Sequence, residues 1–95
     1  MDWRFGNFVW DVEKERENIR KHGVDFEAAA RAFQDPRRKL YTDERHGEQE
    51  ERMFCIGKVG GRIVTVRFTY RSGLIRIYGA GYWRKGRRYY EQEDV

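Results

Sequence analysis

Two short dipeptides, at positions 60–61 and 72–73, constrain the fold of this chain more than any other feature. Gly60-Gly61 and Ser72-Gly73 each separate two stretches rich in β-branched and aromatic residues, which is the typical sequence of a two-residue β-hairpin turn. The sequence therefore predicts three consecutive antiparallel strands, over residues 52–59, 62–71 and 74–80. Because a two-residue turn fixes how the strands pair, it also determines which side chains share a face of the sheet.

The pairing that these turns impose produces one apolar face. With Val59 opposite Arg62 and Arg71 opposite Leu74, side chains that alternate along the strands fall into two sets. The apolar set is Met53, Cys55, Val64, Val66, Phe68, Tyr70, Ile75 and Ile77. We expect this face to form the core, covered by helices. Cys55 is then a buried, unreactive thiol rather than a reactive one.

The opposite face gathers positive charge and aromatic rings. Row by row it carries Arg52, Thr69 and Arg76, then Phe54, Arg67 and Tyr78, with Arg71 at the end. Like charges that share a face repel each other, so this face favours a bound anion. Arginine pairs with phosphate and aromatic rings stack on bases, and together they indicate single-stranded RNA. The alternative is a solvated face on which arginine side chains cover the two rings.

Two short helices are predicted before these strands. Asp11 and Asp25 are typical N-caps, and the first helix ends at about His22, before Gly23. The second helix ends at Pro36. Its buried face follows the helical spacing Phe26, Ala29, Ala30 and Phe33.

The first helix has a thin apolar stripe, in which Val12 and Ile19 share one face. The polar residues predicted to share the opposite face are Lys14, Asn18 and Lys21. His22 has two possible roles: it could contact RNA, or it could hydrogen-bond the last carbonyls of the helix. The second role is favoured, since helices that cover the core lie across the sheet from the charged face.

The remaining segments are short. An apolar start is expected to form a short strand and a turn around positions 6–7, with Trp10 in the core; its residues are Trp3, Phe5, Phe8 and Trp10. A further short strand is predicted over residues 40–42, followed by a mobile polar loop over 43–51. The tail, residues 82–95, is read as a helix or an extended arm interrupted by Gly86. Its basic run is an RNA clamp, a surface for docking a protein partner or a solvated helix, and comprises Trp83, Arg84, Lys85, Arg87, Arg88, Tyr89 and Tyr90.

Composition indicates one folded domain, residues 1–95. The chain is 38% charged yet 16% aromatic, which is unlike a disordered segment. Fifteen arginines against five lysines contribute to a net charge of +4, and an arginine excess suits phosphate. No apolar run is long enough to span a membrane. A single cysteine allows no intrachain disulfide, so we expect a cytoplasmic protein.

One sequence block is specific enough to indicate a family. It consists of Phe8-x-Trp10-Asp11-x-x-Lys14, Asn18, Lys21-His22-Gly23-Val24-x-Phe26-Glu27-x-Ala29 and Phe33-x-Asp35-Pro36. Weaker matches follow in the right order: Asp43, Glu51-Arg52, Gly57, Thr69-x-Arg71, Ile75-Arg76-Ile77 and Tyr90. In these residues the chain resembles the BrnT family of bacterial type II toxins, from about residue 5 to residue 91.

The resemblance implies a RelE-like ribonuclease fold, with two N-terminal helices on one face of an antiparallel meander of about three to five strands. It implies an RNA-cleaving toxin that acts on mRNA and inhibits translation. It also implies neutralisation by a BrnA-type antitoxin, which carries a DNA-binding segment through which the pair represses its own operon. No cofactor, direct DNA contact or membrane partner is implied.

One position departs from the family pattern. Family members often read Ser-Ala-Arg after the Ile-Arg-Ile strand, whereas this chain reads Gly79-Ala80-Gly81. The family arginine is therefore missing at Gly81. Arg84, close by on the tail, could substitute for it.

For the chemistry we expect metal-independent RNA cleavage, in which the 2′-hydroxyl of the substrate is the nucleophile. The histidines and carboxylates show no metal-ligand spacing. Arg67 and Arg76 are the candidates for stabilising the phosphorane charge, and Tyr78 for orienting the substrate or donating a proton. His46 is a candidate general base or acid, or simply an exposed loop histidine.

Further RNA contacts are assigned to the surrounding cations and ring: Arg52, Phe54, Arg71, Arg84, Lys14, Lys21 and His22. Two alternatives to an active ribonuclease remain. One is a non-catalytic module with the same fold that binds RNA or an acidic partner. The other is an obligate subunit with no stable fold of its own.

Overall fold

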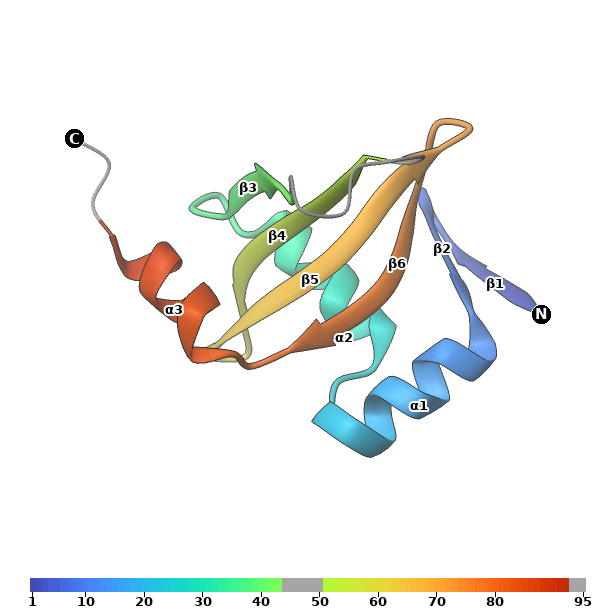
Figure 1. Ribbon diagram of the computed structural model, residues 1–95, viewed down its shortest axis with the longest axis horizontal. Helices are drawn as coiled ribbons and strands as arrows, with labels where there is room; N and C mark the ends of the chain where they lie inside the picture. The colour runs from blue at the N-terminus through green and yellow to red at the C-terminus, as the bar shows by residue number, and fades with distance from the viewer. Residues whose placement is uncertain (44–50, 93–95) are drawn as a thin grey trace.

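The strands of this protein form a single mixed sheet (Figure 1). The computed structural model describes residues 1–43 and 51–92, and within them the sheet has six strands. In chain order the elements are β1 (Asp2–Phe5), β2 (Phe8–Asp11), α1 (Val12–His22), α2 (Phe26–Arg31), a 3-10 turn η1 (Ala32–Gln34), β3 (Lys39–Thr42), β4 (Arg52–Val59), β5 (Arg62–Arg71), β6 (Leu74–Gly81) and α3 (Arg84–Glu91). The predicted α+β class is confirmed.

The sheet is larger than predicted and is not wholly antiparallel. Its order is β1-β2-β6-β5-β4-β3, and β2 runs parallel to β6. The apolar start of the chain forms the β1–β2 hairpin, and Phe8 and Val9 of β2 pair with Ile75 and Arg76. The expectation of an antiparallel meander of three to five strands was therefore wrong. No local sequence pattern predicts that β2 and β6 pair in parallel, because two helices and three strands separate them along the chain.

The two hairpins have the predicted register. The central residues of both turns have positive φ, between 53° and 80°, as the turns that suit twisted hairpins require. Val59 pairs with Arg62 and Arg71 with Leu74, as expected. One irregularity between Arg67 and Phe68 shifts the pairing toward the end of β6. As a result Arg67 lies opposite Gly79, not opposite Tyr78 as the sequence predicted.

Helix α1 begins and ends where the sequence predicted. The Asp11 carboxylate accepts hydrogen bonds from the backbone N–H groups of Glu13 and Lys14, at 2.8 and 3.2 Å. At the other end Gly23 has a φ of 70° and donates its N–H to the Ile19 carbonyl at 2.9 Å. This left-handed residue closes the helix as an αL cap does.

The inward face of α1 is polar, contrary to the prediction. Ile19, expected in the apolar stripe, is 44% exposed, whereas Asn18 is buried. The Asn18 amide donates to the carbonyls of Val24 and Ala80, both at 2.9 Å, and accepts from the Ala80 N–H at 3.1 Å. Glu15, one turn earlier, accepts from the Trp10 indole and from the Phe26 N–H. Side-chain hydrogen bonds, rather than apolar packing, thus fasten α1 to β6 and to the start of α2.

The core lies between the predicted apolar face and the segment from α2 to η1. Phe33 contacts Phe8 and Phe68 edge-on, with ring centroids 5.1 and 5.0 Å apart. Backbone of Ala32 lies so close to Gly57 that a side chain at 57 has no room. The buried cluster comprises Trp10, Val24, Phe26, Ala29, Ala30, Ala32, Cys55, Val64, Val66, Phe68, Ile77 and Ala80. Cys55 is buried, as predicted, and burial raises the pKa of its thiol to about 12.

Helix α3 packs on the opposite face of the sheet. Gly86 does not interrupt this helix; it lies against Thr65 of β5, and a larger residue there would meet the threonine hydroxyl. Lys39 donates to the carbonyls of Tyr89 and Gln92, at 2.6 and 2.5 Å. The C-terminal tail is therefore a helix, anchored over one end of the face that the sequence analysis treated as open.

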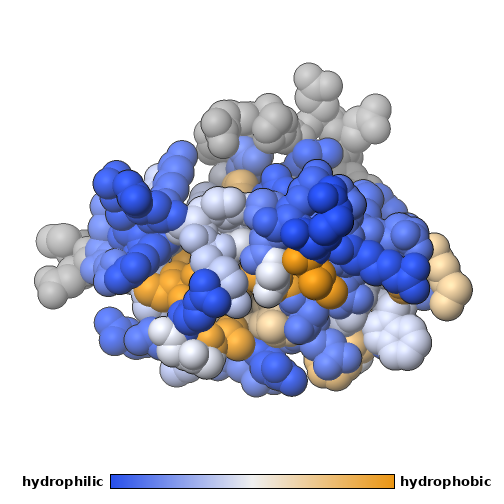
Figure 2. Space-filling view, turned by 90° about the horizontal axis from the view of Figure 1, so that it is seen from below, coloured by the Kyte–Doolittle hydropathy of each residue, from blue (hydrophilic) through white to orange (hydrophobic). Residues whose placement is uncertain are grey.

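The visible surface in Figure 2 is mostly hydrophilic, with apolar residues confined to small patches. Among residues 1–43 and 51–92, none of the helices combines the length and the apolar character of a membrane span.

Candidate functional site

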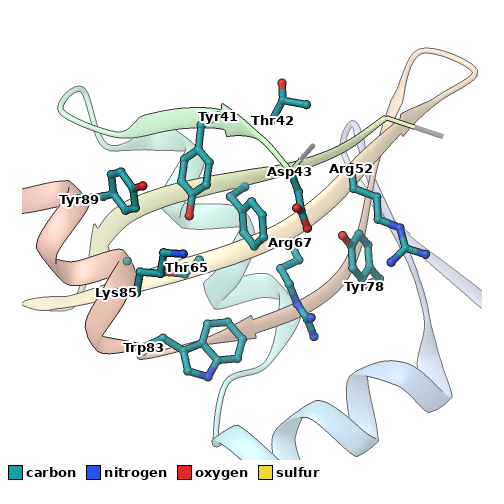
Figure 3. Close-up of a pocket in the computed structure, with 12 residues that line it drawn as sticks. Tyr41, Thr42, Asp43, Arg52, Thr65, Arg67, Tyr78, Trp83, Lys85 and Tyr89 are labelled. Atoms are coloured by element: carbon teal, nitrogen blue, oxygen red, sulfur yellow. The ribbon is translucent and has the colours of Figure 1, made fainter. Parts of the chain in front are cut away.

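A pocket of about 570 Å³ opens on the sheet face opposite the core, between β3, the ends of β4 to β6 and α3 (Figure 3). It is lined by Tyr41, Thr42, Asp43, Arg52, Phe54, Thr65, Arg67, Tyr78, Trp83, Lys85, Gly86 and Tyr89. The predicted RNA face therefore exists as a hollow rather than as a flat sheet, because β3 and α3 form its walls. One end of it is cationic and the other is aromatic.

Arg67 is the central cation of the pocket. Its guanidinium lies 5.5 Å from the ring centroids of both Tyr78 and Trp83. The strand irregularity places Gly79 beside it, and a Cβ at 79 would lie only 2.7 Å from a guanidinium nitrogen. The Nε of Arg67 is buried and has no hydrogen-bond partner among the described residues. A buried donor of this kind is costly unless something accepts its hydrogen bond, which makes it a place for an anion.

Arg52 and Tyr78 complete the cationic end. The Arg52 guanidinium lies 5.4 Å from the ring centroid of Tyr78, and Figure 3 shows the tyrosine between the two arginines. Burial raises the pKa of Tyr78 above its ordinary value, although the positive charges of Arg52 and Arg67 oppose the shift. The phenol therefore remains protonated at neutral pH and can donate a hydrogen bond or a proton.

Asp43 is a pocket residue that the sequence analysis placed in a mobile polar loop. It is 8% exposed, and its backbone N–H donates to the Arg52 carbonyl at 2.7 Å, which continues the β3–β4 pairing. Figure 3 shows its carboxylate pointing into the pocket, and its negative charge contributes to the raised pKa of Tyr78. Among the described lining residues it is the only carboxylate. The sequence signal that could have found it is its position directly after a predicted strand.

Aromatic rings form the other end of the pocket. Tyr41 stacks on Phe54 and on Tyr89, with centroids 4.8 and 5.2 Å apart. Trp83 faces these rings across the pocket, with Lys85 on α3 between them in Figure 3. Sequence reasoning predicted Phe54 for this face, but it missed Tyr41, because a strand of four residues carries too little pattern to place its side chains.

Arg76 lies outside the pocket lining, although the sequence analysis paired it with Arg67. It keeps the predicted row, opposite Thr69, but its guanidinium bonds both carboxylate oxygens of Asp2, at 3.2 and 2.7 Å. The sequence predicts a strand and a turn at the start of the chain, but not that this segment joins the sheet beside β6. The β1–β2 hairpin brings Asp2 to this side of the sheet. Arg71, at the hairpin end, is exposed and also lies outside the lining.

Arg84 is the residue that the sequence offers as a substitute for an arginine at position 81. It is exposed at the start of α3 and does not line the pocket, whereas its neighbours Trp83 and Lys85 do. The Trp83 indole covers Gly81 so closely that a Cβ there would lie 2.7 Å from a ring carbon. The glycine at 81 and the tryptophan at 83 thus fit each other.

The candidates on α1 lie away from the pocket lining. Lys14 and Lys21 are exposed, and Lys21 pairs with Glu17 at 3.3 Å. His22 contacts the edge of Trp83, with ring centroids 5.1 Å apart. Among the described residues, the segment 21–23 therefore reaches the pocket lining through the contact between His22 and Trp83. His46 lies outside the described residues.

Within the part of the chain that the structure describes, no three histidine, cysteine or carboxylate side chains gather as metal ligands do. The pocket offers a half-buried guanidinium, a protonated phenol, a carboxylate and stacked rings. These groups together suit a phosphodiester flanked by bases.

Comparison with protein families agrees with this chemistry. The family of the ribonuclease toxin BrnT, of type II toxin–antitoxin systems, matches residues 10–86. The chain belongs to the BrnT family. The BrnT match begins at Trp10, covers β3 to β6 and includes every pocket residue except Tyr89. It confirms the resemblance seen in the sequence. Membership in the BrnT family implies an RNA substrate and an antitoxin partner. No curated protein matches the sequence.

Proposed function

We propose that this chain is an endoribonuclease that needs no metal ion, cleaves mRNA and so inhibits translation. The observation that carries the proposal is the half-buried guanidinium of Arg67, whose buried Nε lacks a partner among the described residues, beside the protonated phenol of Tyr78. The scissile phosphate binds at Arg67, and Arg52 adds charge at the mouth of the pocket. As the 2′-oxygen attacks phosphorus, both guanidiniums stabilise the developing negative charge.

The bases on either side of the scissile bond need flat surfaces, and the pocket supplies them in Phe54, Tyr41, Tyr89 and Trp83. Stacking on such rings tolerates different sequences, since every base has a π-face. Tyr78 orients the phosphate or donates the proton that the leaving 5′-oxygen requires. Arg76 is paired with Asp2, so its positive charge stabilises the phosphate from a distance rather than by contact with it.

Exposed cations outside the pocket lining extend the RNA-binding surface: Arg71, Arg84, Lys14 and Lys21. His22 supports Trp83 and has no direct RNA contact in this proposal. His46 stays a candidate acid or base from the sequence alone, since it lies outside the described residues. The fold is proposed to be RelE-like. The partner is a BrnA-type antitoxin in the cytoplasm, and DNA is bound only through that antitoxin.

The proposal is tested with the purified chain and a single-stranded RNA in the presence of EDTA. We expect cleavage that leaves a 2′,3′-cyclic phosphate and a 5′-hydroxyl. Arg67→Ala should lower kcat/KM by about 10²- to 10³-fold, the loss typical of removing one preorganised donor to a developing anion. Arg76→Ala should have a smaller effect. Arg62→Ala, on the same strand but outside the pocket, is the control. Equal activity of the parent and Arg67→Ala would place the site elsewhere.

The second candidate is a binding module without catalysis. The observation that favours it is Gly81, where the family pattern has an arginine and this chain has the Trp83 indole instead. Such a module would bind the same RNA with normal affinity and leave it intact at every protein concentration. End-group analysis of the RNA, together with a binding titration, separates the two functions.

A further inference from the structure

The proposed cleavage needs a proton acceptor, and the pocket restricts the choice. Charged and titratable groups line it from every surrounding element: Tyr41 and Asp43 from β3 and the residue after it, Arg52 from β4, Arg67 from β5, Tyr78 from β6, and Lys85 and Tyr89 from α3. Arginine cannot lose its proton in a protein, and the phenol of Tyr78 is held protonated. A carboxylate is an acceptor at neutral pH. Asp43 is the one carboxylate among the described lining residues.

The position of Asp43 suits this role. Its backbone is fixed by the hydrogen bond to the Arg52 carbonyl at 2.7 Å, so the side chain leaves a defined point at the end of β3. The residue is 8% exposed, and its carboxylate points into the pocket on the side of the Tyr78 hydroxyl (Figure 3). A buried negative charge weakens the binding of a phosphate, whereas a carboxylate at this point of the pocket can accept a proton.

We infer that Asp43 is the general base of the cleavage reaction, an inference that rests on the proposed ribonuclease function. The 2′-O–H bond of the substrate breaks and its proton passes to the Asp43 carboxylate. The 2′-oxygen forms a bond to phosphorus, the bond from phosphorus to the 5′-oxygen breaks, and Tyr78 protonates that oxygen. Solvent then takes the proton from Asp43 and returns one to Tyr78.

The test compares the parent chain, Asp43→Asn and Glu27→Gln, an exposed carboxylate on α2 that controls for loss of charge. Asp43→Asn should lower kcat/KM by about 10²- to 10⁴-fold, the range for loss of a general base. Binding of the same RNA sequence with 2′-O-methyl riboses, which cannot be cleaved, should be as tight or tighter.

If Asp43→Asn folds poorly, a second variant keeps the inference testable. Asp43→Ala with added formate should regain part of the lost cleavage, since a small carboxylate can enter the vacated space. Absence of this rescue overturns the inference. So does an Asp43→Asn protein that cleaves at the rate of the parent. If Arg67→Ala is inactive in that experiment, the ribonuclease proposal itself stands. A parent chain that binds RNA but never cleaves it overturns both.

Discussion

At the scale of single residues, one buried polar side chain, Asn18, joins several elements of this fold. Asn18 connects α1 to the loop before α2 and to the end of β6, through three hydrogen bonds to buried backbone groups. The same stretch of β6 leads directly to Gly81 and the pocket. Asn18 therefore determines where α1 sits relative to the strand that carries Tyr78.

Replacing Asn18 by alanine should destabilise the protein by about 3 kcal/mol, because each buried polar group left without a partner costs about 1–3 kcal/mol. Urea denaturation followed by circular dichroism measures this. Ile19→Ala is the matched control on the same helix. With Ile19 44% exposed, its truncation should cost less than about 1 kcal/mol. A larger loss for Ile19→Ala than for Asn18→Ala would contradict the structural assignment.

The sequence predicted which side chains share the pocket face only where a turn fixed the register of the strands. Arg52, Phe54, Arg67 and Tyr78 were found because hairpin pairing placed them on one face. Asp43 was missed because its burial depends on a pairing between β3 and β4 that no tight turn specifies. The helical pattern assigned Asn18 to the solvent-exposed face of α1, because such a pattern assumes that polar residues are exposed. A buried amide is nevertheless stable when it is fully hydrogen-bonded.

At the scale of elements, the fit between α3 and β5 shapes the pocket. Gly86 is the contact point, and its missing side chain lets the helix lie on Thr65. The Oγ1 of Thr65 is buried with no hydrogen-bond partner in the described part of the chain. A glycine inside a helix is normally unfavourable, so its presence here reflects close packing.

Gly86→Ala should therefore destabilise the protein by about 1–3 kcal/mol through overpacking. In an ordinary exposed helix the same change would stabilise by about 1 kcal/mol, so the sign of the effect is diagnostic. Thermal or urea melts of the variant provide the measurement.

The matched control is the double variant Gly86→Ala/Thr65→Ala, which removes the colliding hydroxyl. It should recover most of the loss, and Thr65→Ala alone should be close to neutral, since no hydrogen bond in the described structure is lost. If the double variant is no more stable than Gly86→Ala, the helix does not rest on Thr65 as described.

Element prediction succeeded in proportion to local signals. Caps located α1 and α2, and turns located β4, β5 and β6 almost to the residue. A strand and a turn were predicted at the start of the chain, but the parallel pairing of β2 with β6 was not, because strand neighbours distant in sequence leave no periodic signal. Neither was the irregularity opposite Arg67, although Gly79 is the residue type that such a site accepts.

At the scale of the whole molecule, the two faces of the sheet have separate tasks. The segment from α2 to η1 seals the core on one face, and β3 with α3 forms the walls of the pocket on the other. Asp35, in the turn before β3, ties these parts together. Its carboxylate accepts hydrogen bonds from the Tyr90 hydroxyl at 2.6 Å and from the N–H of Lys58 at 2.7 Å. The Asp35 carboxylate thus connects α3 and β4 to the turn that follows η1.

This junction predicts how stability depends on pH. Partial burial alone would raise the pKa of Asp35, but the hydrogen bonds from Tyr90 and from the N–H groups of Lys58 and Arg37 leave it below its ordinary value of 3.8. A carboxyl group with a lowered pKa in the folded state stabilises the fold above its unfolded pKa, and that contribution is lost as the pH falls through the folded pKa.

Tyr90→Phe should thus cost about 1 kcal/mol at pH 7, where Asp35 is ionised, which lowers Tm by about 4–8 °C for a domain of this size. The difference from the parent should narrow once the pH falls below 3.8 and Asp35 becomes protonated. Calorimetry at pH 7 and at lower pH measures both values. Tyr89→Phe, which removes a neighbouring hydroxyl with no hydrogen bond in the described residues, should change Tm little at either pH. A Tyr90→Phe difference that is the same under acid and neutral conditions would show that the hydroxyl does not act through the ionised Asp35.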